Sequence, residues 1–267
     1  ILSSHNKNLG IHLFSLLTFF VALLTFEKII IFPFILSVYE FTFGNLKNNW
    51  RKLIPFFGIS LLGAVYLVGL FGAKTVLLQT YHYQEPGIEN LLIKIPIAIV
   101  SYIGLIFWPK NLTLYHSELT FTQIEYLIRL ILFVLFLAII IFFFKKDRRI
   151  FFWLLFFLIS LSPTLTPFKF SWAVAERYVY LGAIGIFVLI ALLIQKIGQI
   201  FKNQKITYVI FAIVLLALSV RTIIRNFDWK NQDTLWLAAA KTSPSSHQNH
   251  NNLGDLYYRR GEYEKAM

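Results

Sequence analysis

Residues 127–144 read LIRLILFVLFLAIIIFFF, an apolar run that only Arg129 interrupts. Directly after it stands the basic segment 145–149, which reads KKDRR. A helix needs about 20 apolar residues to cross a bilayer. Basic residues collect at the cytoplasmic ends of such helices. The stretch therefore predicts a transmembrane helix that ends on the cytoplasmic side.

Apolar segments of this kind recur along most of the chain. Three more, 53–72, 178–195 and 206–224, are long enough to cross a membrane alone. Shorter ones lie at 11–25, 29–43, 91–108 and 150–163. Helices are the expected form, since lipid offers the backbone no hydrogen-bond partners. The predicted fold class is all-α, a polytopic bundle of about seven or eight helices.

The composition supports a membrane protein. Of 267 residues 57% are hydrophobic and 14% charged, whereas soluble domains carry about 25% charged residues. The net charge of +12 falls between apolar runs, so it indicates topology and not nucleic-acid binding. Cysteine is absent, which excludes disulfides and zinc–thiolate sites. The chain starts with Ile1, and its last residue, Met267, falls inside a sequence repeat. We therefore expect the chain to be a fragment cut at both ends.

Basic residues give a topology with one inconsistency. Segments 145–149 and 196–205 each carry an excess of three positive charges, which places both in the cytoplasm. Everything after residue 222 is then extracytoplasmic. Segment 44–52 carries a similar excess, yet counting helices backward places it outside. We therefore expect that one segment before residue 110 is not a simple span.

The C-terminal residues 247–267 read HQNHNNLGDLYYRRGEYEKAM, which resembles the tetratricopeptide (TPR) repeat of 34 residues. Small residues at set positions let the two helices of a repeat approach closely, and larger ones fill the seam. The predicted packing residues of this repeat are Leu253, Gly254, Tyr257, Gly261, Tyr263 and Ala266. His250 departs from the usual Trp.

One period earlier, Trp236, Ala239 and Pro244 match the second helix of a preceding repeat. The alternative is an unrelated amphipathic helical hairpin. We expect two domains, a membrane bundle over 1–225 and a truncated extracytoplasmic TPR region over 226–267.

Four segments carry a resemblance to a known family. They are AERYVYL at 175–181, YIGLIFWPKNLT at 102–113, LTFEKIIIFP at 24–33, and the join RNFDW at 225–229. Together with the TPRs they resemble the membrane-bound TPR proteins related to protein O-mannosyltransferases, within the GT-C glycosyltransferase superfamily. The family's Lys before Glu is Phe26 here.

The resemblance implies transfer of a mannose-like sugar from a polyprenyl- or dolichyl-phosphate carrier to a protein or glycan acceptor. An acidic base activates the acceptor hydroxyl, basic residues stabilise the leaving phosphate, and the TPRs hold the acceptor or a partner protein. The family's acidic residues lie in an early outer loop, which we expect upstream of Ile1. We then expect no catalytic residue in this chain and no activity of the chain alone. A divalent cation is expected, if at all, in the full-length protein. The membrane is a bacterial inner membrane or one of ER type.

The resemblance and the charges point to five binding residues. Arg177 is a candidate for the lipid phosphate, Glu176 for orienting Arg177 or contacting sugar hydroxyls, and Tyr178 lies beside them. The alternative is an interfacial ion pair within an aromatic belt. Glu27 and Lys28 interrupt an apolar stretch, which marks either a binding pathway or a tight turn.

Other charged residues suggest less. Lys94 and Arg129 lie near segment ends and are expected to snorkel to the interface. His82 and His116 lack ligand spacing, so no metal site is predicted.

Two other functions stay open. A non-catalytic membrane scaffold with TPRs would lack the early acidic pair in its complete gene. A polysaccharide polymerase or ligase would carry a long outer loop dense in Arg and His.

Overall fold

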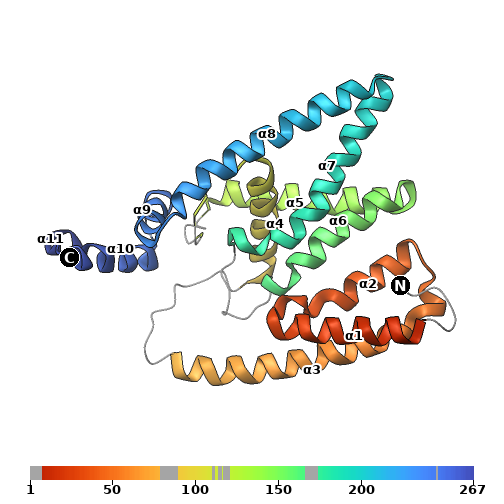
Figure 1. Cartoon of the computed structure of the whole chain (residues 1–267), viewed down its shortest axis with the longest axis horizontal. Helices are drawn as coiled ribbons and strands as arrows, with labels where there is room; N and C mark the ends of the chain where they lie inside the picture. The colour runs from red at the N-terminus through yellow and green to blue at the C-terminus, as the bar shows by residue number, and fades with distance from the viewer. Residues whose placement is uncertain are drawn as a thin grey trace. The chain divides into compact units, whose positions relative to one another are not determined.

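The computed structural model describes residues 8–78, 90–109, 112–113, 116, 121–165, 174–244 and 246–267. The regular structure of these residues is entirely helical, which confirms the all-α prediction (Figure 1). The α-helices are α1 (Asn8–Thr25), α2 (Phe32–Thr42), α3 (Leu46–Leu78), α4 (Leu91–Phe107), α5 (Gln123–Lys146), α6 (Arg148–Leu161), α7 (Tyr180–Ile200), α8 (Gln204–Asp228), α9 (Gln232–Thr242), α10 (His247–Arg259) and α11 (Tyr263–Ala266). Short 3-10 turns are η1 (Glu27–Ile31), η2 (Ser162–Thr164) and η3 (Glu176–Tyr178).

Four of these helices are long and apolar enough to cross a membrane: Leu46–Gly69 within α3, α5, α7 and α8. They are the four segments that the sequence predicts to span alone. Many of their apolar side chains are exposed, as lipid contact requires. The helix boundaries differ from the apolar boundaries, because α3 begins at Leu46 and so includes the basic residues before position 53.

The chain packs into two compact units. The first comprises residues 1–84 and 138–166, and the second comprises residues 85–137 and 167–267. Helix α5 contributes its C-terminal part to the first unit and its N-terminal part to the second.

An aromatic core holds the first unit together. Phe19 and Phe56 are buried and lie with Phe32 in mutual ring contact, at centroid distances of 5.3 to 6.0 Å. The hydroxyl of Ser60 on α3 donates to the carbonyl of Ile30, 3.0 Å away, which ties the turn η1 to α3.

Two helix corners of the first unit meet. Arg148, at the start of α6, donates from Nη1 to the carbonyl of Thr42 at the end of α2, 3.2 Å away. Next to this bond the rings of Phe41 and Phe144 stack at 5.8 Å. Asp147 caps α6 by accepting a hydrogen bond from the backbone N–H of Arg149. The α2–α3 corner and the α5–α6 corner are therefore neighbours.

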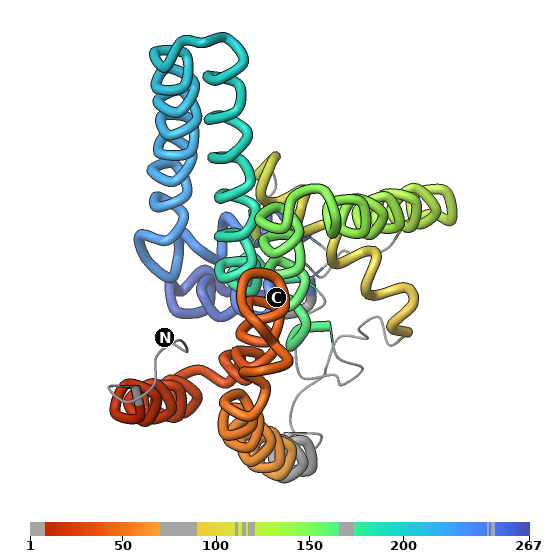
Figure 2. Tube along the Cα trace, turned by 90° about the vertical axis from the view of Figure 1, so that its right-hand side faces the viewer, coloured from red at the N-terminus to blue at the C-terminus, as the bar shows by residue number. Residues whose placement is uncertain are grey.

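In the second unit α7 and α8 form a helical hairpin and lie side by side (Figure 2). Lys202 turns the chain with φ of 48°, and the Asn203 side chain then caps α8 by accepting from the N–H of Lys205. The hairpin closes tightly, since a Cβ on Gly198 would overlap the hydroxyl of Thr207.

Helices α9 and α10 pack around a buried amide. Asn249 is 0% exposed, and its Nδ2 donates to the carbonyls of Ala239 and Ser243 at 3.2 and 3.3 Å. Asn231 begins α9 with a capping box that includes Thr234. The second unit thus places a compact helical region directly after α8.

Candidate functional site

The turn η3 carries the predicted binding residues Glu176, Arg177 and Tyr178, and the residue before it is anchored to α4. Ala175 is extended and fully buried, and its backbone N–H donates to the hydroxyl of Tyr102 on α4, 3.4 Å away. From this anchor the chain presents Glu176 partly buried and Arg177 exposed. The guanidinium of Arg177 lies 5.0 Å from the ring centroid of Tyr178, a cation–π contact.

Glu176 forms an ion pair with Arg225 at the end of α8. Nη2 of Arg225 lies 3.3 Å from both carboxylate oxygens of Glu176, and Nη1 lies 2.9 Å from Oδ2 of Asp228. Arg225 is 9% exposed, so its charge is compensated by two carboxylates at close range. We call Glu176, Arg225 and Asp228 the acidic–arginine cluster.

The surroundings of the cluster shift two pKa values. Burial raises the pKa of Glu176, although the positive charge of Arg225 opposes this. Burial and then the charge of Arg225 lower the pKa of His116 from 6.5 to about 4. His116 is therefore neutral at pH 7, and its buried Nε2 has no hydrogen-bond partner among the described residues.

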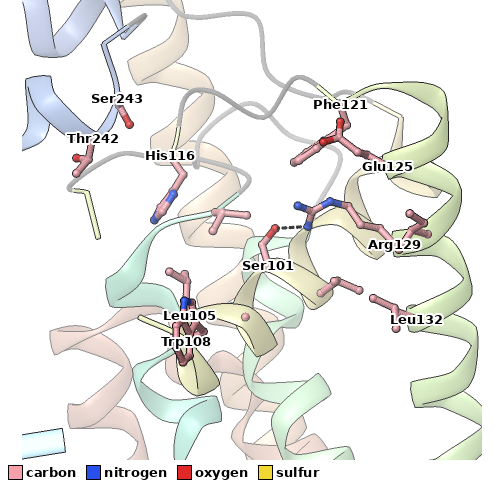
Figure 3. Close-up of a pocket in the computed structure, with 14 residues that line it drawn as sticks. Ser101, Leu105, Trp108, His116, Phe121, Glu125, Arg129, Leu132, Thr242 and Ser243 are labelled. Atoms are coloured by element: carbon pink, nitrogen blue, oxygen red, sulfur yellow. Dashed lines mark hydrogen bonds between the residues drawn. The ribbon is translucent and has the colours of Figure 1, made fainter. Parts of the chain in front are cut away.

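A cavity of about 630 Å³ has His116 in its lining (Figure 3), and the charge of Arg225 in the cluster acts on this same side chain. The second half of α4, the first half of α5, and Thr242 and Ser243 at the end of α9 form its other walls. Arg129 supplies its positive charge. Nη1 of Arg129 donates to the hydroxyl of Ser101 at 3.1 Å, and its guanidinium lies 4.0 Å from the ring centroid of Phe121.

The cavity joins an apolar wall to a guanidinium, an arrangement that suits an amphiphile with an anionic group. Apolar side chains of α4 and α5, among them Leu105, Ile128 and Leu132, form one wall, and Glu125 also belongs to the lining. Arg129 is half-buried with these contacts, and the expectation that it snorkels to the interface stays a prediction. Lys94, expected at the interface as well, is 4% exposed.

Glu27 and Lys28 belong to the first unit. They open the turn η1 between α1 and α2, with Glu27 exposed and Lys28 half-buried. The position agrees with a tight turn between two short helices, and a binding role for them stays a prediction.

The residues predicted to pack a TPR lie in α9 to α11 or in the turns between them. Trp236 and Ala239 are buried, Leu253 and Tyr257 are half-buried, and Tyr263 is exposed. A Cβ on Gly254 would lie 3.2 Å from the carbonyl of Ala266, which explains the small residue there. Gly261, with φ of 75°, ends α10 in the conformation that favours glycine. The carbonyl of Pro244 contacts Nε2 of His250.

Arg225 is the residue that sequence reasoning missed, because in the sequence it belongs to the RNFDW join to the TPRs. A lone Arg in the last turn of an apolar helix, with Asp228 three residues later, was the available signal. Within the described ranges, no three His, Asp or Glu side chains converge as metal ligands would.

Comparison with known proteins supports the resemblance that the motifs carry. Protein O-mannosyl-transferase TMTC3 of Mus musculus is 31% identical over 100 residues, which are 38% of this chain and 11% of the mouse protein. The TMTC3 protein of Homo sapiens is 30% identical over 38% of this chain, and Tmtc2 of Drosophila melanogaster is 31% identical over 37%.

The similarity therefore spans about a tenth of the length of these relatives. No protein-family model matches the chain, and no solved structure matches it. The chain resembles the TMTC protein O-mannosyl-transferases over the matched segment.

Proposed function

We propose that the protein carrying this chain is a membrane glycosyltransferase that transfers a mannose-like sugar from a polyprenyl- or dolichyl-phosphate carrier to a protein or glycan acceptor. The observation that carries the proposal is the similarity to relatives named protein O-mannosyl-transferases. In this reaction the acceptor oxygen forms a bond to the anomeric carbon of the sugar. The bond from that carbon to the phosphate oxygen breaks, and the acceptor proton passes to a carboxylate base, which we place outside this chain.

Arg177 is the residue that we assign to the phosphate. The leaving phosphate gains negative charge, and a guanidinium meets its oxygens in a bidentate way. Arg225 already faces the carboxylates of Glu176 and Asp228, whereas Arg177 is exposed at the surface of η3. On this proposal the acidic–arginine cluster has a structural role, because it fixes the position of the turn η3. Glu176 holds the turn to α8 through Arg225, and Arg177 and Tyr178 face the donor.

We assign the adjoining cavity to the apolar part of the donor close to its phosphate. Arg129 adds a positive charge there beside the carboxylate of Glu125, and the aliphatic side chains of α4 and α5 match isoprene units. The TPR region, which we place outside the cytoplasm, holds the acceptor or a partner protein. On this proposal the bundle over 1–225 binds the donor and the region over 226–267 binds the partner.

The test is transfer by the protein expressed with whatever sequence its gene encodes on either side. Membranes are supplied with mannosyl-phosphoryl dolichol, and labelled mannose in protein is measured. Arg177→Ala should lower the rate of transfer about 100-fold, as loss of one charge-stabilising donor does. The matched control is Lys196→Ala, which removes an exposed charge near the other end of α7 and should leave the rate unchanged.

Equal rates for Arg177→Ala and wild type would refute the phosphate role of Arg177. No transfer by the wild-type protein, in membranes where a known mannosyltransferase is active, would refute the enzymatic proposal and favour the scaffold.

A further inference from the structure

One end of the first unit carries seven exposed basic side chains. They come from two segments, 44–52 and 145–149, in which Asp147 is the one acidic residue. We call these seven the basic rim: Lys47, Arg51, Lys52, Lys145, Lys146, Arg148 and Arg149. Asp147 pairs with Arg149 at 3.2 Å, so a large positive excess faces outward.

The rim is one surface although its halves lie far apart in the sequence. The bond from Arg148 to the carbonyl of Thr42 joins residues 106 positions apart. The stacked rings of Phe41 and Phe144 and the edge contact of Phe43 with Phe152, at 5.3 Å, lie beside it. Both basic segments therefore lie on the same side of the membrane.

Exposed aromatic side chains accompany the rim. Trp50 is 50% exposed, Tyr39 49% and Phe43 45%. The guanidinium of Arg51 lies 5.6 Å from the ring centroid of Trp50, and Nζ of Lys146 lies 4.6 Å from that of Phe142. Tryptophan and tyrosine side chains concentrate at the level of lipid headgroups. The rim thus has the composition of a surface set in the headgroup layer.

We propose that the basic rim binds anionic phospholipid headgroups of the cytoplasmic leaflet. The basic residues of the rim lie at the ends of helices whose apolar side chains are exposed, as lipid contact requires. The phosphates of lipid headgroups are therefore the anions next to the rim. Clusters of four to eight Lys and Arg at the cytoplasmic ends of membrane helices attract such lipids. The proposal does not depend on sugar transfer.

The shared side settles the conflict in the helix count. Helix α3 leaves the rim and α5 returns to it, so on this proposal the other ends of α3 and α5 lie on the extracytoplasmic side. Helix α4 is the apolar helix that the described residues contain there, and it has 17 residues with Pro96 inside. On this proposal α4 is the segment before residue 110 that is not a simple span, and segment 44–52 is cytoplasmic.

The lipid contact is tested with the full chain reconstituted in phosphatidylcholine bilayers. A part of the lipid is replaced by dibrominated phosphatidylglycerol or dibrominated phosphatidylcholine, which quench nearby tryptophan. The quenching that belongs to Trp50 is obtained as the difference between the wild type and the Trp50→Phe variant. We expect phosphatidylglycerol to associate several-fold more strongly than phosphatidylcholine. This preference should be smaller in 0.5 M salt because salt screens the charges, and the Debye length falls to about 3 Å at about 1 M salt.

Arg51→Gln with Lys52→Gln should remove most of this preference. Lys196→Gln with Lys205→Gln removes the same charge from the α7–α8 corner and should leave it intact. Equal quenching by both lipids in the wild type, or an equal loss in both double variants, would overturn the proposal.

The side of the membrane is tested by single cysteines, since the chain has none. Asn48→Cys and Lys145→Cys should react with a membrane-impermeant maleimide only after permeabilisation, and Gln232→Cys should react before it. Reaction of Asn48→Cys or Lys145→Cys in sealed cells would contradict the cytoplasmic placement.

Discussion

Arg225 illustrates how single residues set the geometry of the second unit. Its guanidinium is buried at the end of an apolar helix and binds Glu176 and Asp228. Removing one partner of a buried ion pair leaves the other charge uncompensated, which costs about 3–5 kcal/mol. Replacing both partners by neutral groups costs far less.

We expect Arg225→Gln to lower the free energy of unfolding of the second unit by about 3 kcal/mol. The double variant with Glu176→Gln should recover part of this loss, because the partly buried Glu176 carboxylate is then no longer left unpaired and Asp228 alone faces the neutral side chain. Thermal unfolding in detergent, followed by helical circular dichroism, measures both. Strictly additive losses would show that the two residues are not coupled.

His116 gives the second unit a dependence on pH. Its pKa is about 4 in the folded chain and 6.5 when unfolded, so the unfolded chain binds more protons between these values. Stability should therefore fall as the pH drops from 6.5 toward 4, by up to about 3 kcal/mol. His116→Gln should weaken this fall while matching the wild type at pH 7.5. The check is the unfolding midpoint of both proteins across this range, and parallel curves would contradict the assignment.

At the scale of elements, hydropathy predicts where lipid begins and not where a helix begins. The four long spans were predictable because their apolar runs are long and contain few charges. The start of α3 was not, since the helix already begins at Leu46 and includes Lys47, Arg51 and Lys52 ahead of the apolar run. Lys and Arg are good helix formers, so the helix extends beyond the apolar run.

The closeness of α7 and α8 depends on a glycine. A Cβ at position 198 would overlap the hydroxyl of Thr207 and lie 3.1 Å from its Cβ. Gly198→Ala should thus separate the two helices and lower the unfolding midpoint by several degrees, at about 1–3 kcal/mol for overpacking.

Gly58→Ala is the matched control, since nothing lies within 4 Å of a Cβ there. It should leave the midpoint unchanged or raise it through higher helix propensity. Similar midpoints for the two variants would show that the hairpin does not need the glycine.

At the scale of the whole molecule, local patterns were predictable and long-range pairs were not. The sequence carried the all-α class, the four spans and the resemblance at 175–181. It could not reveal that Glu176 meets Arg225, 49 residues away, because no local period links them. The same holds for the bond from Arg148 to Thr42, which joins the two basic corners. The cavity around Arg129 was also out of reach, since four stretches that lie apart in the sequence contribute to its lining.

The junction of α8 with α9 has a mechanical consequence. Helix α8 is continuous from Gln204 to Asp228, and the hydroxyl of Thr234 in α9 donates to the carbonyl of Asp228 at 3.0 Å. An inserted residue in α8 would rotate α9 by about 100° around the helix axis and advance it by about 1.5 Å. The number of residues in α8 therefore determines the direction in which α9 leaves the axis of α8.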